Sequence, residues 1–179
     1  MDILLIKTDP SSCHLDIRFR LENPSHIIFS SAANSNMINH FFLMVSASKM
    51  PALRNFYRTI LQPLGYTEMI VVKDGNICGF GSDYPYFWLK ALPEGKEPVP
   101  THIAIEAKGI QLFGEEQNTE TDTRPDPAAV DKFYEIAIKA GGIDNGKPGI
   151  RPGMSRQPYY AAFVIDADGN NFEAVSVVK

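Results

Sequence analysis

The chain contains an internal repeat, which strongly restricts the folds open to it. A Phe-Tyr pair occurs twice, each time with a glycine nine residues after the phenylalanine, at Phe56, Tyr57 and Gly65 and at Phe133, Tyr134 and Gly142. Each block follows a short apolar run that opens with histidine, at His40 and at His102. Such self-similarity indicates two copies of one supersecondary unit that share a core. It also predicts that two imidazoles occupy equivalent places in the two units.

Periodicity gives the first unit the order β-α-β-β-β, and the repeat assigns the same order to the second unit, which predicts the α+β class. In the first unit, strand patterns at 40–45, 69–73, 77–81 and 86–92 accompany a helix that begins near Pro51 and ends before Gly65. In the second unit, strand patterns occur at 102–107, 159–165 and 171–178. Its helix begins at Asp126-Pro127 and ends at Gly141-Gly142, and Asn145-Gly146 is expected to form a turn.

The repeat also sets the expected domain boundaries. Residues 1–36 have no counterpart in either unit and are expected to be an extension, possibly poorly ordered, although the alternation at 15–21 is typical of an added strand. Residues 37–178 are expected to form one domain. It comprises module one at 37–92, a linker at 93–100 with three prolines, and module two at 101–178. The spacing of the repeat places an acidic insertion at 109–124, which we interpret as a solvated loop.

Composition narrows the classes of partner. The chain has 179 residues, 44% of them hydrophobic and 21% charged, and a net charge of −4. Without a Lys/Arg cluster, neither nucleic acid nor a membrane surface is an expected partner. No apolar run is long enough to span a bilayer or to form a signal peptide. The two cysteines have no metal-ligand spacing, so we expect free thiols and a cytoplasmic location.

Three residues form a candidate metal site. His40 and His102 open equivalent strands, and Glu173 lies in the last apolar strand, where an ionised carboxylate is costly unless it faces water or a cation. Two histidines and one carboxylate can occupy one face of a metal octahedron and leave positions for substrate. Zn²⁺, Fe²⁺, Mn²⁺, Ni²⁺ and Co²⁺ all accept such ligands. Module one carries Trp88 at the position equivalent to Glu173, and tryptophan cannot bind a metal.

Several segments together resemble a known family. They are His40-Phe-Phe-Leu-Met-Val-Ser, Pro63-Leu-Gly-Tyr66, His102-Ile-Ala-Ile, Asp126-Pro-Ala-Ala-Val-Asp-Lys-Phe-Tyr134 and Asp166-Ala-Asp-Gly-Asn-Asn-Phe-Glu173. Over about residues 37–178 the chain is similar to the vicinal oxygen chelate superfamily of glyoxalases, bleomycin-resistance proteins and extradiol dioxygenases. The run from Ala140 to Pro152, with Tyr159-Tyr-Ala-Ala-Phe, looks like its short glyoxalase-like members. The resemblance implies two βαβββ modules forming a cupped mixed sheet around a divalent metal, and a homodimer.

The resemblance carries the metal ligands over onto His40, His102 and Glu173. The fourth, carboxylate ligand of glyoxalase I falls on Trp88, which argues against glyoxalase I activity. Glu106 shares the face of His102 by strand alternation, and Glu173 or Glu106 is the expected catalytic residue that relays a proton. Arg151, Tyr159, Tyr160 and Trp88 are candidate substrate contacts.

Three interpretations of function stay open. The first is a metal-dependent enzyme of isomerase, lyase or dioxygenase type that acts on a small oxygen-bearing molecule. The second is a metal-free protein of the bleomycin-resistance type that sequesters a small molecule. The third, weaker interpretation is an accessory interaction protein whose cup is filled by side chains.

Overall fold

The computed structural model describes residues 6–8, 15–17, 38–107, 126–153 and 158–177. The expected insertion at 109–124 and Cys13 therefore lie outside the described residues. The chain divides into two compact units, Met1–Asn36 and Met37–Lys179. In the first unit, β1 (Ile6–Thr8) pairs antiparallel with β2 (Leu15–Ile17).

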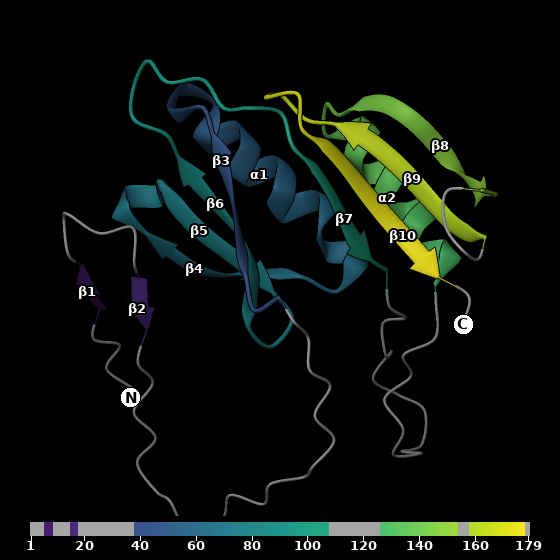
Figure 1. The fold of residues 1–179 in the computed structure, drawn as a ribbon, viewed down its shortest axis with the longest axis horizontal. Helices are drawn as coiled ribbons and strands as arrows, with labels where there is room; N and C mark the ends of the chain where they lie inside the picture. Colours follow the sequence, from purple (N-terminus) through teal and green to yellow (C-terminus); the bar gives the residue numbers. More distant parts are fainter. Residues whose placement is uncertain (1–5, 9–14, 18–37, 108–125, 154–157, 178–179) are drawn as a thin grey trace, which may run out of the picture. The chain divides into compact units, whose positions relative to one another are not determined.

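The second unit begins with a four-stranded mixed sheet (Figure 1). Its strands are β3 (Phe41–Val45), β4 (Thr67–Val72), β5 (Ile77–Gly81) and β6 (Pro85–Ala91), in the spatial order β3-β6-β5-β4. Strands β3 and β6 are parallel and the other pairs are antiparallel. Helix α1 (Met50–Ile60) connects β3 to β4, flanked by single 3₁₀ turns at Ala47–Lys49 and Gln62–Leu64. A third 3₁₀ turn, Lys73–Gly75, joins β4 to β5.

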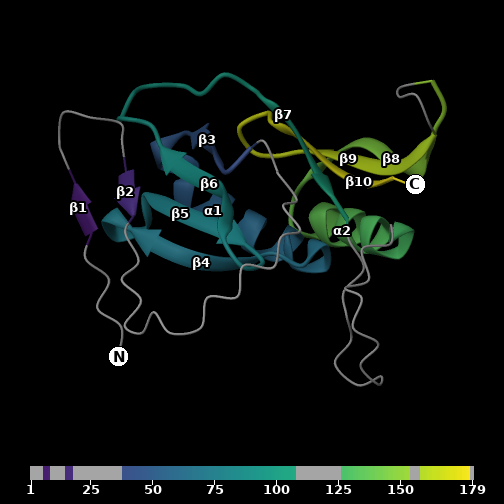
Figure 2. The same ribbon diagram turned by 60° about the horizontal axis from the view of Figure 1, so that its bottom comes forward.

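A second four-stranded mixed sheet repeats this arrangement. Its strands are β7 (His102–Glu106), β8 (Ile143–Arg151), β9 (Tyr159–Ile165) and β10 (Asn171–Val177), in the order β7-β10-β9-β8. Again the first and last strands of the module, β7 and β10, are parallel. Helix α2 (Pro127–Lys139) lies against this sheet (Figure 2). The α+β class and the paired βαβββ modules are confirmed.

The strand register confirms the alignment of the repeat residue by residue. In the first sheet, Phe42 lies opposite Trp88. In the second, Ala104 lies opposite Glu173. Phe42 and Ala104 each come two residues after the histidine of their module, so Trp88 and Glu173 occupy equivalent positions in the two sheets.

Local sequence explains why both helices form where they do. Pro51 occupies the first turn of α1, where a missing N–H costs nothing, and Gly65 ends the following 3₁₀ turn with a φ of 79°. The Asp126 carboxylate caps α2 by accepting hydrogen bonds from the backbone N–H groups of Ala128 and Ala129. Each helix buries one apolar face, which includes Phe56 and Tyr57 in α1 and Phe133 in α2.

The expected turn at Asn145-Gly146 is wrong, because both residues lie inside strand β8. This strand contains glycine and proline, which are depleted in strands, so its pattern does not indicate one. It forms nonetheless at the edge of the sheet, where two register shifts, on either side of Gly146, absorb the irregular residues. The N–H of Gly146 donates to the Asp144 carboxylate, which is the local turn-like contact that the sequence suggests.

One apolar core joins the two modules. The ring of Phe172 in β10 lies 5.4 Å from that of Tyr57 in α1, 5.9 Å from Phe87 in β6 and 5.8 Å from Phe133 in α2, measured between centroids. All four side chains are fully buried. Burial of aromatic surface at such edge-to-face and tilted contacts is a large favourable contribution to folding. Cys78, a free thiol, belongs to the same core, and burial raises its pKa to about 12.

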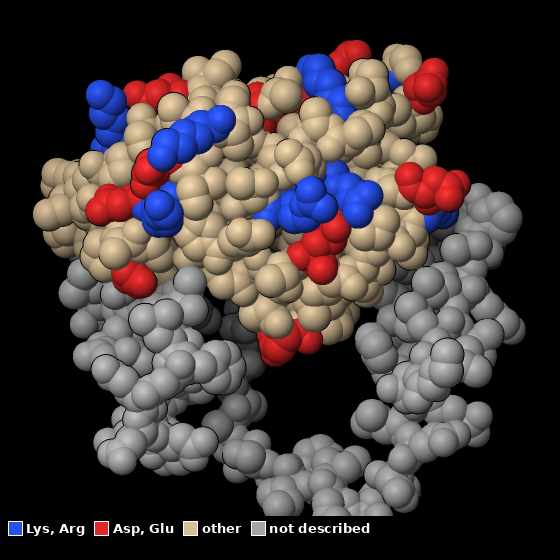
Figure 3. Space-filling view, turned by 180° about the vertical axis from the view of Figure 1, so that it is seen from behind, with Lys and Arg blue, Asp and Glu red and all other residues tan. Residues whose placement is uncertain are grey.

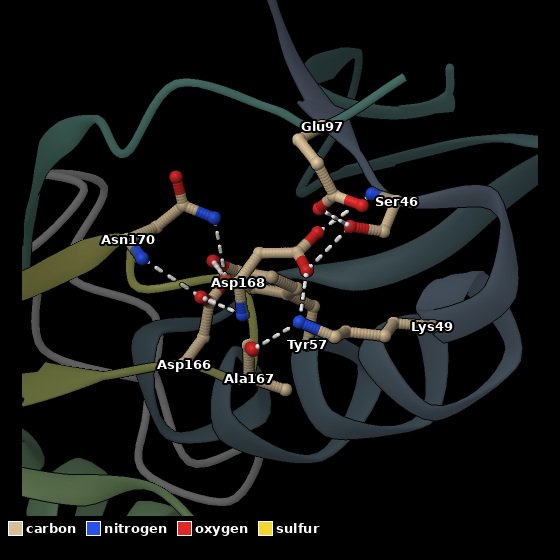
Figure 4. Close-up of polar contacts among 8 residues, drawn as sticks. All are labelled: Ser46, Lys49, Tyr57, Glu97, Asp166, Ala167, Asp168 and Asn170. Atoms are coloured by element: carbon tan, nitrogen blue, oxygen red, sulfur yellow. Dashed lines mark hydrogen bonds and ion pairs between the residues drawn. The ribbon is translucent and has the colours of Figure 1, made fainter. Parts of the chain in front are cut away.

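A polar network connects the β9–β10 turn of module two to module one (Figure 4). The buried Tyr57 hydroxyl donates to Asp166 Oδ2 at 2.7 Å, and the same oxygen accepts from Asn170 Nδ2 at 2.8 Å. The neighbouring Asp168 carboxylate accepts from the Ser46 backbone N–H at 2.6 Å and pairs with Lys49 Nζ at 3.0 Å. Burial opposes ionisation of Asp168, but these contacts outweigh it and lower its pKa. The turn is therefore held by bonds from both modules.

Removal of the Tyr57 hydroxyl tests this connection. Tyr57→Phe leaves a buried carboxylate short of one donor and is expected to lower the free energy of unfolding by about 1–3 kcal/mol. Tyr160→Phe is the matched control, because its hydroxyl also donates to a carboxylate at 2.7 Å, that of Asp131, but at the surface. There the change is expected to stay within about 0.5 kcal/mol. Equal losses in the two variants, measured by urea denaturation, would contradict the buried connection.

Candidate functional site

The candidate site lies on the face of the second sheet that points away from the core. Side chains of β7 alternate between exposed and buried, and His102, Ala104 and Glu106 share the outer face. His102 Nε2 donates to Glu173 Oε2 across the β7–β10 pair at 3.0 Å. The imidazole is 52% exposed, whereas the carboxylate is only 7% exposed. The structure therefore brings together two of the three residues predicted to bind a metal.

Burial makes the Glu173 carboxyl harder to ionise than a free one. Burial raises its pKa above the usual 4.5, and this outweighs the opposing effects of His102, of the Arg151 charge and of a hydrogen bond from Tyr159. A carboxylate with a raised pKa in contact with an exposed imidazole is suited to proton transfer. Carboxyl groups with perturbed pKa values cluster at functional sites, so Glu173 is a candidate for one.

Two asparagines extend the site, and neither was identified as a site residue from the sequence. Asn171 precedes Glu173 by two residues in β10 and lies opposite His102. Its Nδ2 donates to His102 Nδ1 at 2.7 Å, and its Oδ1 accepts from Asn145 Nδ2 of β8 at 3.1 Å. The strand register, once known, is what identifies Asn171, because it places the amide beside the ring.

Arg151 and Phe163 form the next part of the same face. Phe163 lies opposite Glu173 in β9, and the Arg151 guanidinium carbon lies 5.1 Å from the centroid of its ring. Arg151 Nη2 donates to the carbonyl oxygen of Ala161 at 3.2 Å. Its buried Nε contacts no acceptor among the described residues. Gly146 is required beneath this pair, because a Cβ there would lie 2.8 Å from the Phe163 ring.

The remaining candidate site residues of module two lie on two different faces of the second sheet. Tyr159 hydrogen-bonds to Glu173 and so belongs to the site. Tyr160 points to the helix side, where its hydroxyl donates to Asp131 of α2. Glu106 shares the face of His102 and lies two residues beyond Ala104, which is opposite Glu173. Of the two tyrosines, only Tyr159 can act together with Glu173 in this arrangement.

His40 lies apart from the His102–Glu173 pair. It precedes β3 and is exposed, its Nδ1 lies 2.7 Å from Asn39 Oδ1, and its ring centroid lies 5.8 Å from that of Phe42. Within the described ranges, which include all three predicted ligands, no three His, Cys, Asp or Glu side chains are grouped to hold a metal ion. A single chain thus offers two donors at this site and does not by itself complete the predicted set.

Trp88 fills the position in module one that corresponds to Glu173. It is 2% exposed, its Nε1 donates to the Pro85 carbonyl oxygen at 2.7 Å, and its ring lies 5.5 Å from Phe42. Gly79 lies directly beneath, since a Cβ there would be 3.1 Å from the indole ring. Module one therefore presents an aromatic pair where module two presents a carboxylate.

Surface charge and helix composition bear on possible partners. On the face drawn in Figure 3, basic and acidic side chains of the described residues are interspersed, with no extended basic patch. Neither α1 nor α2, nor any shorter helix of the described part, has the length and apolar character needed to cross a membrane.

The order of elements, the two sheets and the register define a protein of the glyoxalase/bleomycin-resistance fold. A solved structure with this fold is a glyoxalase/bleomycin resistance protein from Albidiferax ferrireducens T118, which is 21% identical and superposes with a TM-score of 0.60. The match covers 78% of this chain and 98% of that one.

Two further solved structures are less similar. A glyoxalase/bleomycin resistance protein/dioxygenase from Nocardioides is 17% identical with a TM-score of 0.49, covering 79% of this chain and 83% of that one. The fosfomycin resistance protein FosX from Mesorhizobium loti is 14% identical with a TM-score of 0.46, covering 78% and 90%. No family model and no curated protein sequence matches the chain.

Because the Glu173 carboxylate is buried, we expect that replacing it with a neutral side chain stabilises the protein. Because the pKa of Glu173 is raised in the folded state, the stabilisation from its proton is present at low pH and lost as pH rises through the folded pKa. Glu173→Gln is therefore expected to be more stable than the wild type near about pH 7, with the difference shrinking at acidic pH. Thermal denaturation over a pH series measures this.

Glu135→Gln is the control of opposite sign. Glu135 is exposed on α2, and Lys139 and Lys132 lower its pKa, so its neutralisation should slightly destabilise the protein near neutrality. A Glu173→Gln variant that loses stability at neutral pH would contradict the account of the site.

Proposed function

We propose that the protein is a metal-dependent enzyme that acts on a small oxygen-bearing organic molecule, with His40, His102 and Glu173 as ligands of a divalent ion. The observation that carries the proposal is the 3.0 Å separation of His102 Nε2 and Glu173 Oε2. Two donors that each lie about 2.1 Å from an ion, at right angles to one another, are about 3.0 Å apart. The pair thus fits two neighbouring positions of an octahedral ion.

The third ligand in this proposal is His40 of a second copy of the chain. In one chain His40 contacts Asn39 and Phe42 and is not grouped with the other two ligands. Its Nε2 makes no hydrogen bond with a described residue, and its ring is exposed. A homodimer in which each His40 reaches the partner's His102–Glu173 pair would complete two sites. The zinc, iron, manganese, nickel and cobalt ions all stay candidates.

In this proposal, residues of the chain around the ion would transfer a proton and orient the substrate. A bound divalent ion would polarise a substrate oxygen as a Lewis acid. Glu173 would accept a proton from the substrate at the carboxylate oxygen that does not hold the ion. Tyr159 and Arg151 would orient an oxygen-rich or anionic group of the substrate, and Glu106 would offer a second carboxylate on the same face.

A second candidate function, metal-free binding of a planar or aromatic compound, is supported by a separate observation. Module one exposes Phe42, at 36%, and the buried Trp88 packs behind it at the position equivalent to the carboxylate. Aromatic faces of this kind bind planar ligands by stacking. In both functions the partner is a small molecule, and a cytoplasmic location stays a prediction.

Metal content and complementation distinguish these functions. The purified wild type is expected to bind about one divalent ion per chain, and Glu173→Ala and His102→Ala are each expected to weaken binding by about 100-fold or more. His40→Ala should lose binding to a similar degree. Isothermal titration with Zn²⁺, Mn²⁺ and Ni²⁺, together with elemental analysis, measures both stoichiometry and affinity. Glu135→Gln, on the exposed side of α2, is the control and should bind as the wild type does.

Mixed variants test whether the ligands come from two copies. Unfolding and refolding His40→Ala together with His102→Ala is expected to restore one complete site in each mixed dimer. Neither variant alone should bind the ion tightly. Absence of stoichiometric metal from the wild type, with ligand binding unchanged in His40→Ala and His102→Ala, would instead support the metal-free binding protein. Failure of the mixture to recover binding, with wild type binding intact, would contradict the two-copy site.

A further inference from the structure

The two histidines of the repeat have opposite neighbours at Nδ1. His40 Nδ1 faces the amide oxygen Oδ1 of Asn39 at 2.7 Å. His102 Nδ1 faces the amide nitrogen Nδ2 of Asn171, also at 2.7 Å. An amide oxygen can only accept a hydrogen bond, and an amide NH₂ group can only donate. In the neutral rings, the proton of His40 is therefore on Nδ1 and that of His102 is on Nε2.

The bonds at His102 continue in one direction across the sheet. Asn145 Nδ2 donates to Asn171 Oδ1 at 3.1 Å, and Asn171 Nδ2 donates to His102 Nδ1. His102 Nε2 then donates to Glu173 Oε2 at 3.0 Å. An ionised carboxylate has only acceptors, so it is a suitable end for the series. We call this series of four residues the relay, and each of its three hydrogen bonds joins a donor to an acceptor.

Reversing the direction of these hydrogen bonds would turn His102 Nε2 from a hydrogen-bond donor into an acceptor. If Asn171 turned its oxygen toward the ring, the proton would move to Nδ1, and the Nε2 lone pair would face the Glu173 carboxylate at 3.0 Å. Two acceptors at this distance repel each other unless a cation lies between them. Asn145 would have to turn as well, because Asn171 would then present its NH₂ group to it. The two amides therefore reverse together.

We infer that the Asn145–Asn171 amide pair sets the position of the proton on His102, and so decides whether Nε2 is a hydrogen-bond donor or a free lone pair. Asn171 is a positioning residue that acts through the ring, and Asn145 acts through Asn171. In the cation-free protein His102 is an Nε2–H donor to Glu173, whereas its repeat partner His40 keeps a free Nε2. The consequence for metal affinity rests on the proposed function, but the proton positions do not.

Nitrogen NMR of the imidazoles measures this directly. The full chain, labelled with ¹⁵N-histidine and freed of metal with a chelator, is studied in alkaline buffer with the rings in the neutral form. Long-range proton–nitrogen spectra separate the two tautomers, and His40→Gln and His102→Gln assign the signals. The expected result is Nε2–H for His102 and Nδ1–H for His40.

Asn145→Asp is the decisive variant, because Asn145 contacts Asn171 and not the ring. A carboxylate at 145 can only accept, so it draws the NH₂ group of Asn171 and turns the Asn171 oxygen toward His102. The ratio of Nδ1–H to Nε2–H is then expected to rise by about fivefold, the value of one net hydrogen bond. Asn171→Asp should have the same effect by direct contact.

Ile143→Asp is the matched control for charge. It adds a carboxylate to the same edge strand at a position that is 64% exposed. It should leave both tautomers unchanged, and the His40 signal should stay unchanged in every variant. Circular dichroism confirms that each variant is folded.

The outcomes separate the relay from the proposed function. An Nδ1–H tautomer of His102 in the wild type, or a response to Ile143→Asp as large as that to Asn145→Asp, would overturn the relay. If the tautomers behave as expected and the chain binds no Zn²⁺, the relay stands and the metal site fails. If Zn²⁺ binds, Asn145→Asp should bind it about fivefold more tightly than Ile143→Asp does, since its His102 Nε2 is already free.

Discussion

The hydrogen bond between the Tyr57 hydroxyl and the Asp166 carboxylate holds the two modules in one arrangement. Asp166 also closes the β9–β10 turn by accepting from the backbone N–H groups of Asp168 and Asn170, at 2.9 and 2.8 Å. Strand β10 starts directly after this turn, and its Phe172 inserts between aromatic rings of both modules. Because residues of a strand alternate, burial of Phe172 turns Glu173 to the opposite face. The stability of the core and the orientation of the candidate site thus depend on the same few contacts.

Except for strand β8, the scaffold could be predicted from the sequence, and the reason is the duplication. Two copies of one pattern constrain each other, so the strands, the helices and the alignment of Trp88 with Glu173 could be predicted by comparing the modules. In the parallel pairs β3–β6 and β7–β10, Trp88 and Glu173 each lie opposite the residue that comes two positions after the histidine of their module. The pairing of His102 with Glu173 follows from the same register.

The parts of the site that the sequence could not predict depend on contacts between strands. Alternation alone indicates that Tyr159 and Tyr160 face opposite sides, but only the packing of α2 on β9 decides which side holds Asp131. Asn171 is an ordinary strand residue until the register places it beside His102. Strand β8 could not be predicted because it contains glycines, which are uncommon in strands. Here glycine allows the register shifts of an edge strand and leaves space for the Phe163 ring.

The contact between Gly79 and Trp88 has a consequence for how this protein could have diverged. A symmetric duplicate would carry carboxylates in both sheets, whereas module one holds an indole so close to Gly79 that a Cβ there would lie 3.1 Å from the ring and 2.9 Å from the Cβ of Pro85. Replacing Trp88 by glutamate would leave a buried void beside a glycine and an acid in an apolar setting, which destabilises the fold. Refilling that space first would clash with the indole. The two positions are thus epistatic, and a mutational path back to two equal sites passes through an unstable intermediate.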